Sequence, residues 1–372
     1  MLERLRFPAE RSRGRRYPEP SHPYRDAFQR DRDRVIHSRA FRRLEAKTQV
    51  FTPALSDHFR NRLTHTIEVA QISRTVANVL GLNEDLTEAL ALVHDVGHPP
   101  FAHAGEAALD RAMGRFGERF DHNLHALHVV ESFEQRYAAF PGLNLTFELR
   151  EGIVKHSRDF GPGEVPELDQ YLPGLRPPLE AQIIDLADEV AYTAGDLDDA
   201  YGAGILTPDA VAAESGTCAA ILAKIRADYP AAGEREWVSE SVRQLIDWLV
   251  TGLIDGTAAA ARDAGIEDFE AVRLYPERVA RFSPETRELT RSLKRLMHAK
   301  VYSSEPLAQD RRRSMERIGE LFEFFLKSPD SLPAGYRERA GNTPVHRAIC
   351  DYLAGMTDIF FNRIYGQTVG GG

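Results

Sequence analysis

Apolar residues recur with the 3.6-residue period of an α-helix through most of this sequence, and no convincing set of alternating strands interrupts them. In residues 63–82, for example, Leu63 and Ile67 fall on one helical stripe. Helix boundaries are also marked, since Asn83 precedes two acidic residues and Gly97 is closely followed by two prolines. The sequence therefore predicts a mainly α fold in one large domain.

The expected helices cover residues 63–82, 83–96, 101–113, 122–138, 146–157, 179–201, 237–263, 285–301, 309–327 and 344–365. Between them, residues 158–178 are rich in proline and glycine and predict a long loop, a kind of segment that often serves as a lid or a binding element. We expect a basic arm over residues 1–30, a catalytic core over 31–225, and a C-terminal helical part of the same domain over 226–372.

Charge is distributed unevenly along the chain. Residues 1–43 contain thirteen arginines and six acidic residues, a local balance of +7, so with a net charge of −9 the rest of the chain carries −16. An arginine-rich segment of this kind favours an anionic partner, such as a nucleotide phosphate or a nucleic acid. A solvated arm or a contact between subunits explains the charge equally well, and these alternatives stay open.

The composition favours a cytoplasmic protein. No apolar run approaches the roughly 18 residues that a membrane-spanning helix needs. The N-terminal segment also lacks the apolar stretch of a secretory signal. The two cysteines, Cys218 and Cys350, lie far apart without metal-type spacing, which is typical of a reducing compartment. We expect no membrane association.

Four ionisable residues lie inside otherwise apolar helical patterns: His65, the pair His94-Asp95, and Asp188. Any one of them alone could be a satisfied core or capping residue. Together they predict a metal site, because a divalent cation directly compensates buried carboxylates and imidazoles. Two imidazoles and two carboxylates suit Mn, Fe, Ni or Zn. The sequence does not choose among these metals and Mg or Co.

The segment HDVGHPPFAHAGE (94–106) adds further histidines to the metal-type pair. His103 and Glu106 are three residues apart and share a helix face, so the carboxylate can orient the imidazole and favour its protonated form, as a general acid requires. Seven of the thirteen histidines lie at position 65 or between 94 and 128. Such clustering favours one functional site.

A second stripe of polar residues lies on the predicted helix 179–201. Asp188, Tyr192 and Asp196 recur at four-residue intervals and therefore share a face. This face suits a metal at one end and the hydroxyl groups of a sugar further along. A solvated acidic face remains a reasonable alternative for Asp196.

These residues and their order resemble the HD-domain metal-dependent phosphohydrolases, and most closely the deoxyguanosinetriphosphate triphosphohydrolase-like branch. The matching segments are SRAFRRLEAKTQV (38–50), RNRLTHTIEVAQ (60–71), HDVGHPPFAHAGE (94–106), FDHN (120–123), ADEVAY (187–192), DLDDAYGAG (196–204) and DYLAGMTD (351–358). One departure is Ala102, where the family often has glycine. The resemblance covers most of the chain and implies the helical HD fold.

The same resemblance implies hydrolysis of a deoxynucleoside triphosphate to a deoxynucleoside and tripolyphosphate, which would control the cellular pool of these nucleotides. The implied metal ligands are His65, His94, Asp95 and Asp188. His103 is implied as the acid–base residue, oriented by Glu106. The implied substrate contacts are Arg62, His98 and His122 for the phosphates and Gln49, Tyr192 and Asp196 for the deoxyribose. A homo-oligomer and an activating nucleotide are further expectations, and the preferred base cannot be transferred.

Two other functions stay open. The first is an HD-type phosphohydrolase that acts on a nucleoside monophosphate, a cyclic nucleotide or a guanosine alarmone. The second is a regulatory protein that binds nucleic acid, including single strands, and has a vestigial site. The run Arg311-Arg312-Arg313 is a second candidate phosphate contact, although a solvated helix start is the simpler interpretation.

Overall fold

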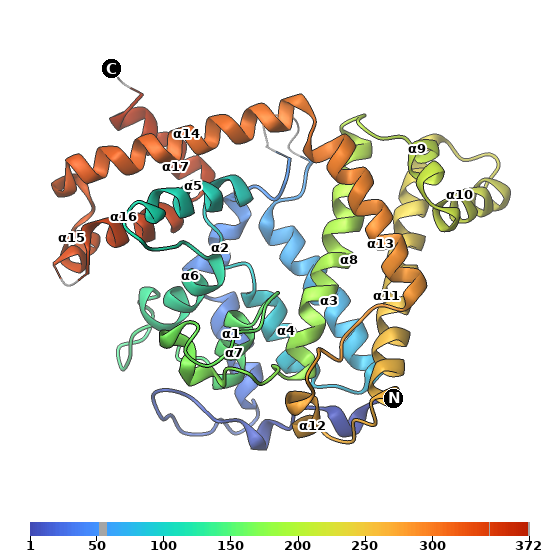
Figure 1. The fold of residues 1–372 in the computed structure, drawn as a ribbon, viewed down its shortest axis with the longest axis horizontal. Helices are drawn as coiled ribbons and strands as arrows, with labels where there is room; N and C mark the ends of the chain where they lie inside the picture. Colours follow the sequence, from blue (N-terminus) through green and yellow to red (C-terminus); the bar gives the residue numbers. More distant parts are fainter. Residues whose placement is uncertain (52–57, 342, 371–372) are drawn as a thin grey trace. The chain divides into compact units, whose positions relative to one another are not determined.

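A computed structural model describes residues 1–51, 58–341 and 343–370 and confirms the mainly α fold (Figure 1). Across these residues the extended backbone forms no strand, only three isolated bridges. No helix in the described ranges is long and apolar enough to cross a membrane.

The chain folds into two compact units. The first comprises Met1–Arg34, His65–Leu92 and Leu145–Ser304, and the second comprises Val35–Thr64, Val93–Asn144 and Glu305–Gly372. Helices that lie wholly or mostly in the first unit are α1 (Ala27–Ile36), α3 (Arg62–Leu80), α4 (Glu84–Val93), α7 (Phe147–Val154), α8 (Leu179–Gly202), α9 (Pro208–Glu214), α10 (Gly216–Asp228), α11 (Glu234–Asp263), α12 (Phe269–Leu274) and α13 (Pro284–Leu296). Those of the second are α2 (Arg39–Arg43), α5 (Ala102–Gly114), α6 (His122–His128), α14 (Glu305–Lys327), α15 (Ala334–Ala340), α16 (Val345–Ala354) and α17 (Asp358–Thr368).

Helix α8 is central to the first unit, where it packs against α11 and α13. It begins directly after two prolines, which fix an extended backbone before the first turn. The buried side chain of Gln182 then holds this end of the helix in place: its Nε2 donates to the Pro177 carbonyl at 2.9 Å, and its Oε1 accepts from the Val279 amide at 2.7 Å. The polar stripe of α8 is thereby fixed relative to the segment before α13.

In the second unit, α14 packs along α5 and α16, as Figure 1 shows. Their contact faces supply an apolar core that includes Leu109, Met113, Phe322, Phe325, Leu353 and Phe361. This core holds the start of α5 and the end of α16 on one body. His103 lies at the start of α5, and Ala354 is the last residue of α16.

Three predicted helices are interrupted within their expected ranges. The one predicted over 285–301 ends as α13 at Leu296 and continues as a π-helical turn. The one predicted over 122–138 ends as α6 at His128, continues as a π-helical turn (η4, Val129–Phe133), and is followed by non-helical chain. The one predicted over 344–365 is two helices, because α16 ends before Gly355 and Thr357 caps α17 by accepting the Phe360 amide at 3.2 Å. Apolar periodicity continued through the latter two breaks. The N-cap at Thr357 accounts for the break after α16, whereas at His128 the chain passes into a π-helical turn without a side-chain cap.

The basic arm is part of the first unit and is hydrogen-bonded to the other segments of that unit. The Phe7 amide donates to Glu180 at 2.9 Å, and Arg15 pairs with the buried Asp31. Asp31 also accepts the Thr146 amide at 2.9 Å. A wholly solvated arm is therefore the wrong interpretation of these residues, since part of their positive charge neutralises acids of the same unit.

The Pro- and Gly-rich segment 158–178 contains a short 3-10 helix (η5, Pro166–Tyr171) whose Leu168 and Tyr171 side chains are buried. Lys155 secures the segment by donating to the carbonyls of Leu172 and Leu175 at 2.9 and 2.8 Å. The predicted long loop is thus anchored over much of its length.

Replacing Glu180 tests the attachment of the arm. Its buried Oε1 accepts both the Phe7 amide and the Asn83 amide, at 2.9 and 3.0 Å. Glu180→Ala leaves both donors buried without a partner, so we expect it to lower the free energy of unfolding by about 2 to 4 kcal/mol. Chemical denaturation measures this loss.

Two variants serve as controls for that experiment. Glu180→Gln keeps the accepting oxygen and should cost clearly less. Glu270→Ala removes only the exposed ion pair with Arg11 and should cost about 0.5 kcal/mol or less. Equal stability of Glu180→Ala and the wild type would show that these hydrogen bonds do not hold the arm.

Candidate functional site

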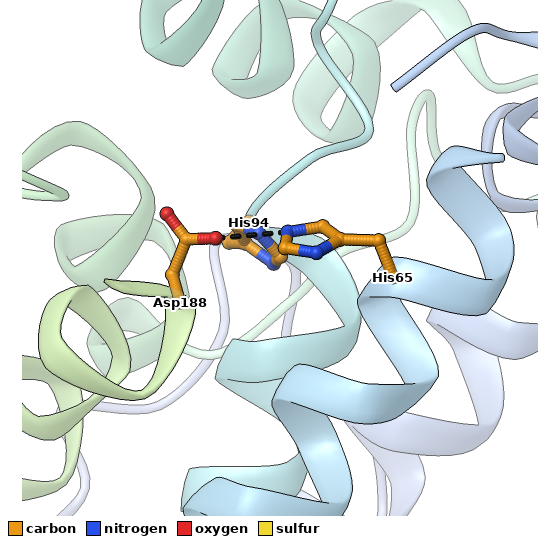
Figure 2. A group of neighbouring side chains, drawn as sticks. All are labelled: His65, His94 and Asp188. Atoms are coloured by element: carbon orange, nitrogen blue, oxygen red, sulfur yellow. Dashed lines mark hydrogen bonds and ion pairs between the residues drawn. The ribbon is translucent and has the colours of Figure 1, made fainter. Parts of the chain in front are cut away.

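Within the first unit, the predicted ligands His65 and Asp188 meet. His65 lies in the first turns of α3 and Asp188 near the middle of α8. The His65 Nε2 and Asp188 Oδ1 atoms are 2.8 Å apart, and Figure 2 shows the two side chains pointing toward each other. His65 is buried, so its imidazole is held in one orientation by this carboxylate.

Within the second unit, Asp95 is the centre of a buried charge cluster and is only 4% exposed. Arg62 Nη1 donates to its Oδ2 at 2.8 Å, and His98 Nε2 lies 3.1 Å from its Oδ1. The Nε2 atom of the adjacent His94 lies 3.5 Å from the same Oδ1 atom. Burial acts to raise the pKa of Asp95, but Arg62, His94 and His98 outweigh it and hold this pKa well below its usual value. Asp95 is therefore an anion at neutral pH.

The described residues include two groups of side chains that could hold a metal ion. One is His65, His94 and Asp188, and the other is His98, Glu106 and His122. The residue types of the first group fit a borderline divalent cation, which imidazole and carboxylate ligands prefer. Each group contains one close His–carboxylate pair, but two members of the first group are buried, His65 and His94, and only one of the second, His98. The first group is therefore the better candidate for a resident ion.

The chain turns sharply between His98 and α5, and small residues make this turn possible. A Cβ on Gly105 would overlap the Pro100 carbonyl, and one on Gly97 would overlap the backbone of α6. Phe101 and Ala102 adopt left-handed backbone angles, with φ of 62° and 52°. Such angles are costly for residues other than glycine. The structure thus gives Ala102 a strained conformation.

His103, the predicted acid, follows this turn, and its side chain is 83% exposed. Its Nδ1 lies 3.7 Å from Glu106 Oε2, so the closer partner of Glu106 is His122. Partial burial acts to raise the pKa of Glu106, but its bonds to His103 and His122 lower it far below the usual value. An ionised carboxylate thus faces an accessible imidazole.

His98 and His122 form a stacked pair, with ring centroids 3.9 Å apart and an angle of 16° between their planes. Burial, reinforced by Arg62 and His122, holds the pKa of His98 well below its usual value. The buried Nδ1 of His98 has no hydrogen-bond partner among the described residues. Arg62, beside this pair, presents guanidinium donors of the kind that bind phosphate oxygens.

The predicted sugar stripe lies on α8 in the first unit. Asp196 is 3% exposed, so a solvated acidic face is the wrong interpretation of this residue. Tyr302, at the end of a π-helical turn (η6, Met297–Tyr302), donates its hydroxyl to Asp196 Oδ2 at 2.5 Å. Lys294 lies 5.6 Å from the centroid of the Tyr192 ring and pairs with Glu189.

Gln49 belongs to the second unit, where its side-chain oxygen is buried without a hydrogen-bond partner among the described residues. Arg311-Arg312-Arg313 is exposed on α14, and Arg312 pairs with Glu305 at 2.7 Å, as the solvated alternative expected.

Sequence reasoning missed three polar residues near these groups. Tyr302 is separated from Asp196 by 106 positions, and no local pattern marks it. Lys47 and Asp358 lie within the quoted segments SRAFRRLEAKTQV and DYLAGMTD, but spacing alone gave them no chemical role. Only the folded structure shows what their side chains contact.

Comparison with known proteins identifies the family of the chain. The HD domain model matches residues 62–193, and a phosphohydrolase-associated domain model matches residues 280–367. A deoxyguanosinetriphosphate triphosphohydrolase-like protein of Azoarcus sp. (strain BH72) is 45% identical over 348 residues, covering 93% of this chain and 91% of that protein. One of the same name from Geobacter sulfurreducens is 42% identical over 361 residues, covering 95% and 92%. The chain therefore belongs to the HD-domain phosphohydrolases, in the deoxyguanosinetriphosphate triphosphohydrolase-like family.

Proposed function

We propose that this phosphohydrolase cleaves deoxynucleoside triphosphates to deoxynucleoside and tripolyphosphate, as the names of its relatives suggest. The observation that carries the proposal is the pairing of the exposed His103 with Glu106, a carboxylate that His122 anchors. An imidazole held in this way can protonate the poor alkoxide leaving group that such a reaction releases.

The metal ligands in this proposal are His65, His94, Asp95 and Asp188, two imidazoles and two carboxylates. A divalent cation bound by them supplies Lewis acidity toward the phosphoryl group and a nucleophile derived from water. The burial of His65 and Asp95 supports this assignment, because buried ligands hold a fixed geometry. Mn, Mg, Fe, Ni, Co and Zn all remain candidates for the ion.

The triphosphate is bound by Arg62, His98 and His122. Arg62 contributes positive charge and N–H donors beside Asp95. The stacked imidazoles become additional donors on protonation, which the negative charge of bound phosphates favours. Holding the phosphates at several points fixes the α-phosphorus for attack in line with the leaving oxygen. Water then bonds through its oxygen to the α-phosphorus and releases a proton to solvent, while the bond from that phosphorus to the 5′ oxygen breaks. His103 donates its proton to that oxygen.

The deoxyribose is read by Gln49, Tyr192 and Asp196. The free side-chain oxygen of Gln49 can accept from a sugar hydroxyl. Asp196, held by Tyr302, is a second acceptor of fixed position. A site built to bond the 3′ hydroxyl against the aromatic face of Tyr192 leaves little room for a 2′ hydroxyl, which accounts for a preference for deoxynucleotides.

The partners implied by this activity are a deoxynucleoside triphosphate substrate, a second copy of the chain, and an activating nucleotide. Single-stranded nucleic acid remains a candidate partner for the basic arm. A cytoplasmic location fits such an enzyme. Binding of nucleic acid would weaken steeply as salt concentration rises.

The first test is product analysis with purified, metal-loaded protein and each deoxynucleoside triphosphate and ribonucleoside triphosphate. We expect tripolyphosphate as the first product, and a loss of roughly 100-fold or more in kcat for His103→Ala, the size expected for a general acid. His37→Ala, at an exposed histidine remote from these groups in the sequence, should retain activity. Orthophosphate or pyrophosphate as the first product would exclude this function in favour of another HD-type phosphohydrolase.

Metal content provides a second test. Asp188→Asn removes a charged ligand but leaves α8 intact, so we expect roughly tenfold or greater weakening of Mn²⁺ binding, measured by equilibrium titration. Asp198→Asn, on the same helix, is the matched control and should bind Mn²⁺ as the wild type does. Unchanged affinity in Asp188→Asn would remove Asp188 from the ligand set.

Sugar selection is tested through Tyr302. Tyr302→Phe removes the donor that holds Asp196, so the carboxylate can reorient. We expect kcat/KM for deoxynucleoside triphosphates to fall about tenfold, equivalent to about 1.4 kcal/mol. The preference over ribonucleotides should shrink with it. Tyr201→Phe, another partly buried tyrosine of the same unit, should change neither value. If Tyr302→Phe kept the full preference, the bond to Asp196 would have no part in sugar recognition.

A further inference from the structure

Asp358, the first residue of α17, joins two segments of the second unit that are distant in sequence. Its Oδ1 accepts the Phe101 amide at 3.0 Å. Its Oδ2 accepts both the amide and the hydroxyl of Thr48, at 2.9 and 2.5 Å. The residue is 9% exposed, so one buried carboxylate is shared by three donors from two segments.

Two cations of the same segment as Thr48 strengthen this junction. The buried Lys47 donates from Nζ to the His98 carbonyl and, at 3.3 Å, to the Ala354 carbonyl. Arg43 donates to the Gly355 carbonyl at 3.1 Å. Residues 43–48 therefore hold the turn before α5 and the end of α16 together.

Capping of α17 does not require Asp358. Thr357 occupies the N-cap position and accepts the Phe360 amide through its own hydroxyl. The two carboxylate oxygens of Asp358 are instead turned toward Phe101 and Thr48. Its contacts thus serve these two segments more than its own helix.

The two segments held by Asp358 each lead directly to a proposed functional residue. Phe101 and Ala102 are the residues in left-handed conformation, and His103 follows them. Backbone strain of this kind persists only where the surroundings fix the conformation. Thr48, on the other oxygen, directly precedes Gln49. One carboxylate therefore fixes the chain entering the acid and the chain entering a sugar-reading residue.

From these contacts we infer that Asp358 is a positioning residue, which sets the strained turn before His103 and the backbone before Gln49 at the same time. This role rests on the proposed function for its effect on catalysis. Its effect on the backbone is independent of any substrate. The two effects can be measured separately.

The direct test is Asp358→Asn, a variant of the same shape that keeps one accepting oxygen and loses the other. Hydrogen–deuterium exchange of the peptide 98–106 reports the amide bond of Phe101 without substrate. We expect exchange of that peptide to be about tenfold faster, as for a weakened local structure. Thr357→Ala, the neighbouring cap variant, should leave it unchanged. A folded Asp358→Asn protein with wild-type exchange over 98–106 would overturn the inference.

Kinetics separate positioning from general stabilisation. We expect Asp358→Asn to lower kcat about tenfold with a smaller change in KM, and to add less than about twofold to the loss in His103→Ala, because residues that act through one another are not additive. A full tenfold loss on the His103→Ala background would show that Asp358 does not act through His103. Wild-type protein without triphosphohydrolase activity would refute the proposed function, while the exchange experiment would still decide the role of Asp358.

A second variant tests the other carboxylate oxygen of Asp358, Oδ2. It also provides a test if Asp358→Asn does not fold. Thr48→Val removes the hydroxyl donor and keeps the Thr48 amide and the Phe101 bond. We expect a reduced preference for deoxynucleotides, through Gln49, with wild-type exchange over 98–106. Unchanged sugar preference would overturn the part of the inference that concerns Gln49.

Discussion

The buried ion pair between Arg62 and Asp95 is the interaction on which the rest of the site depends. A buried carboxylate is stable as an anion only if it is paired, and Arg62, with His98, supplies that compensation. Removing Arg62 alone would leave Asp95 charged in an apolar surrounding, which costs more than the pair contributes. Asp95, two residues beyond the end of α4, is thus tied to Arg62 at the start of α3.

Local patterns in the sequence indicated the candidate site residues, but not the contacts between distant segments. The pair His94-Asp95 closing an apolar helix, and the helical spacing of His103 and Glu106, were local patterns with a direct physical meaning. The mainly α fold followed from apolar periodicity in the same way. The breaks at His128 and Gly355 did not, because the apolar pattern continues through the π-helical turn after His128 and through the N-cap at Thr357.

Contacts that join distant segments were beyond such reasoning. Asp358 binds Thr48 across 310 positions, and Tyr302 binds Asp196 across 106. No periodicity encodes these pairs, and an aspartate at the start of a helix is ordinarily interpreted as favourable charge near the helix dipole. The left-handed backbone conformation of Ala102 was also not predictable, because an alanine does not indicate a positive φ. Such long-range contacts bring together residues that the sequence marks only by separate local patterns.

The central claim is that water attacks the α-phosphorus of a deoxynucleoside triphosphate. Hydrolysis in water enriched with oxygen-18, followed by mass spectrometry of both products, tests this most directly. The account predicts that one labelled oxygen enters tripolyphosphate and none enters the deoxynucleoside. Label in the 5′ hydroxyl of the deoxynucleoside, or in released orthophosphate or pyrophosphate, would contradict it.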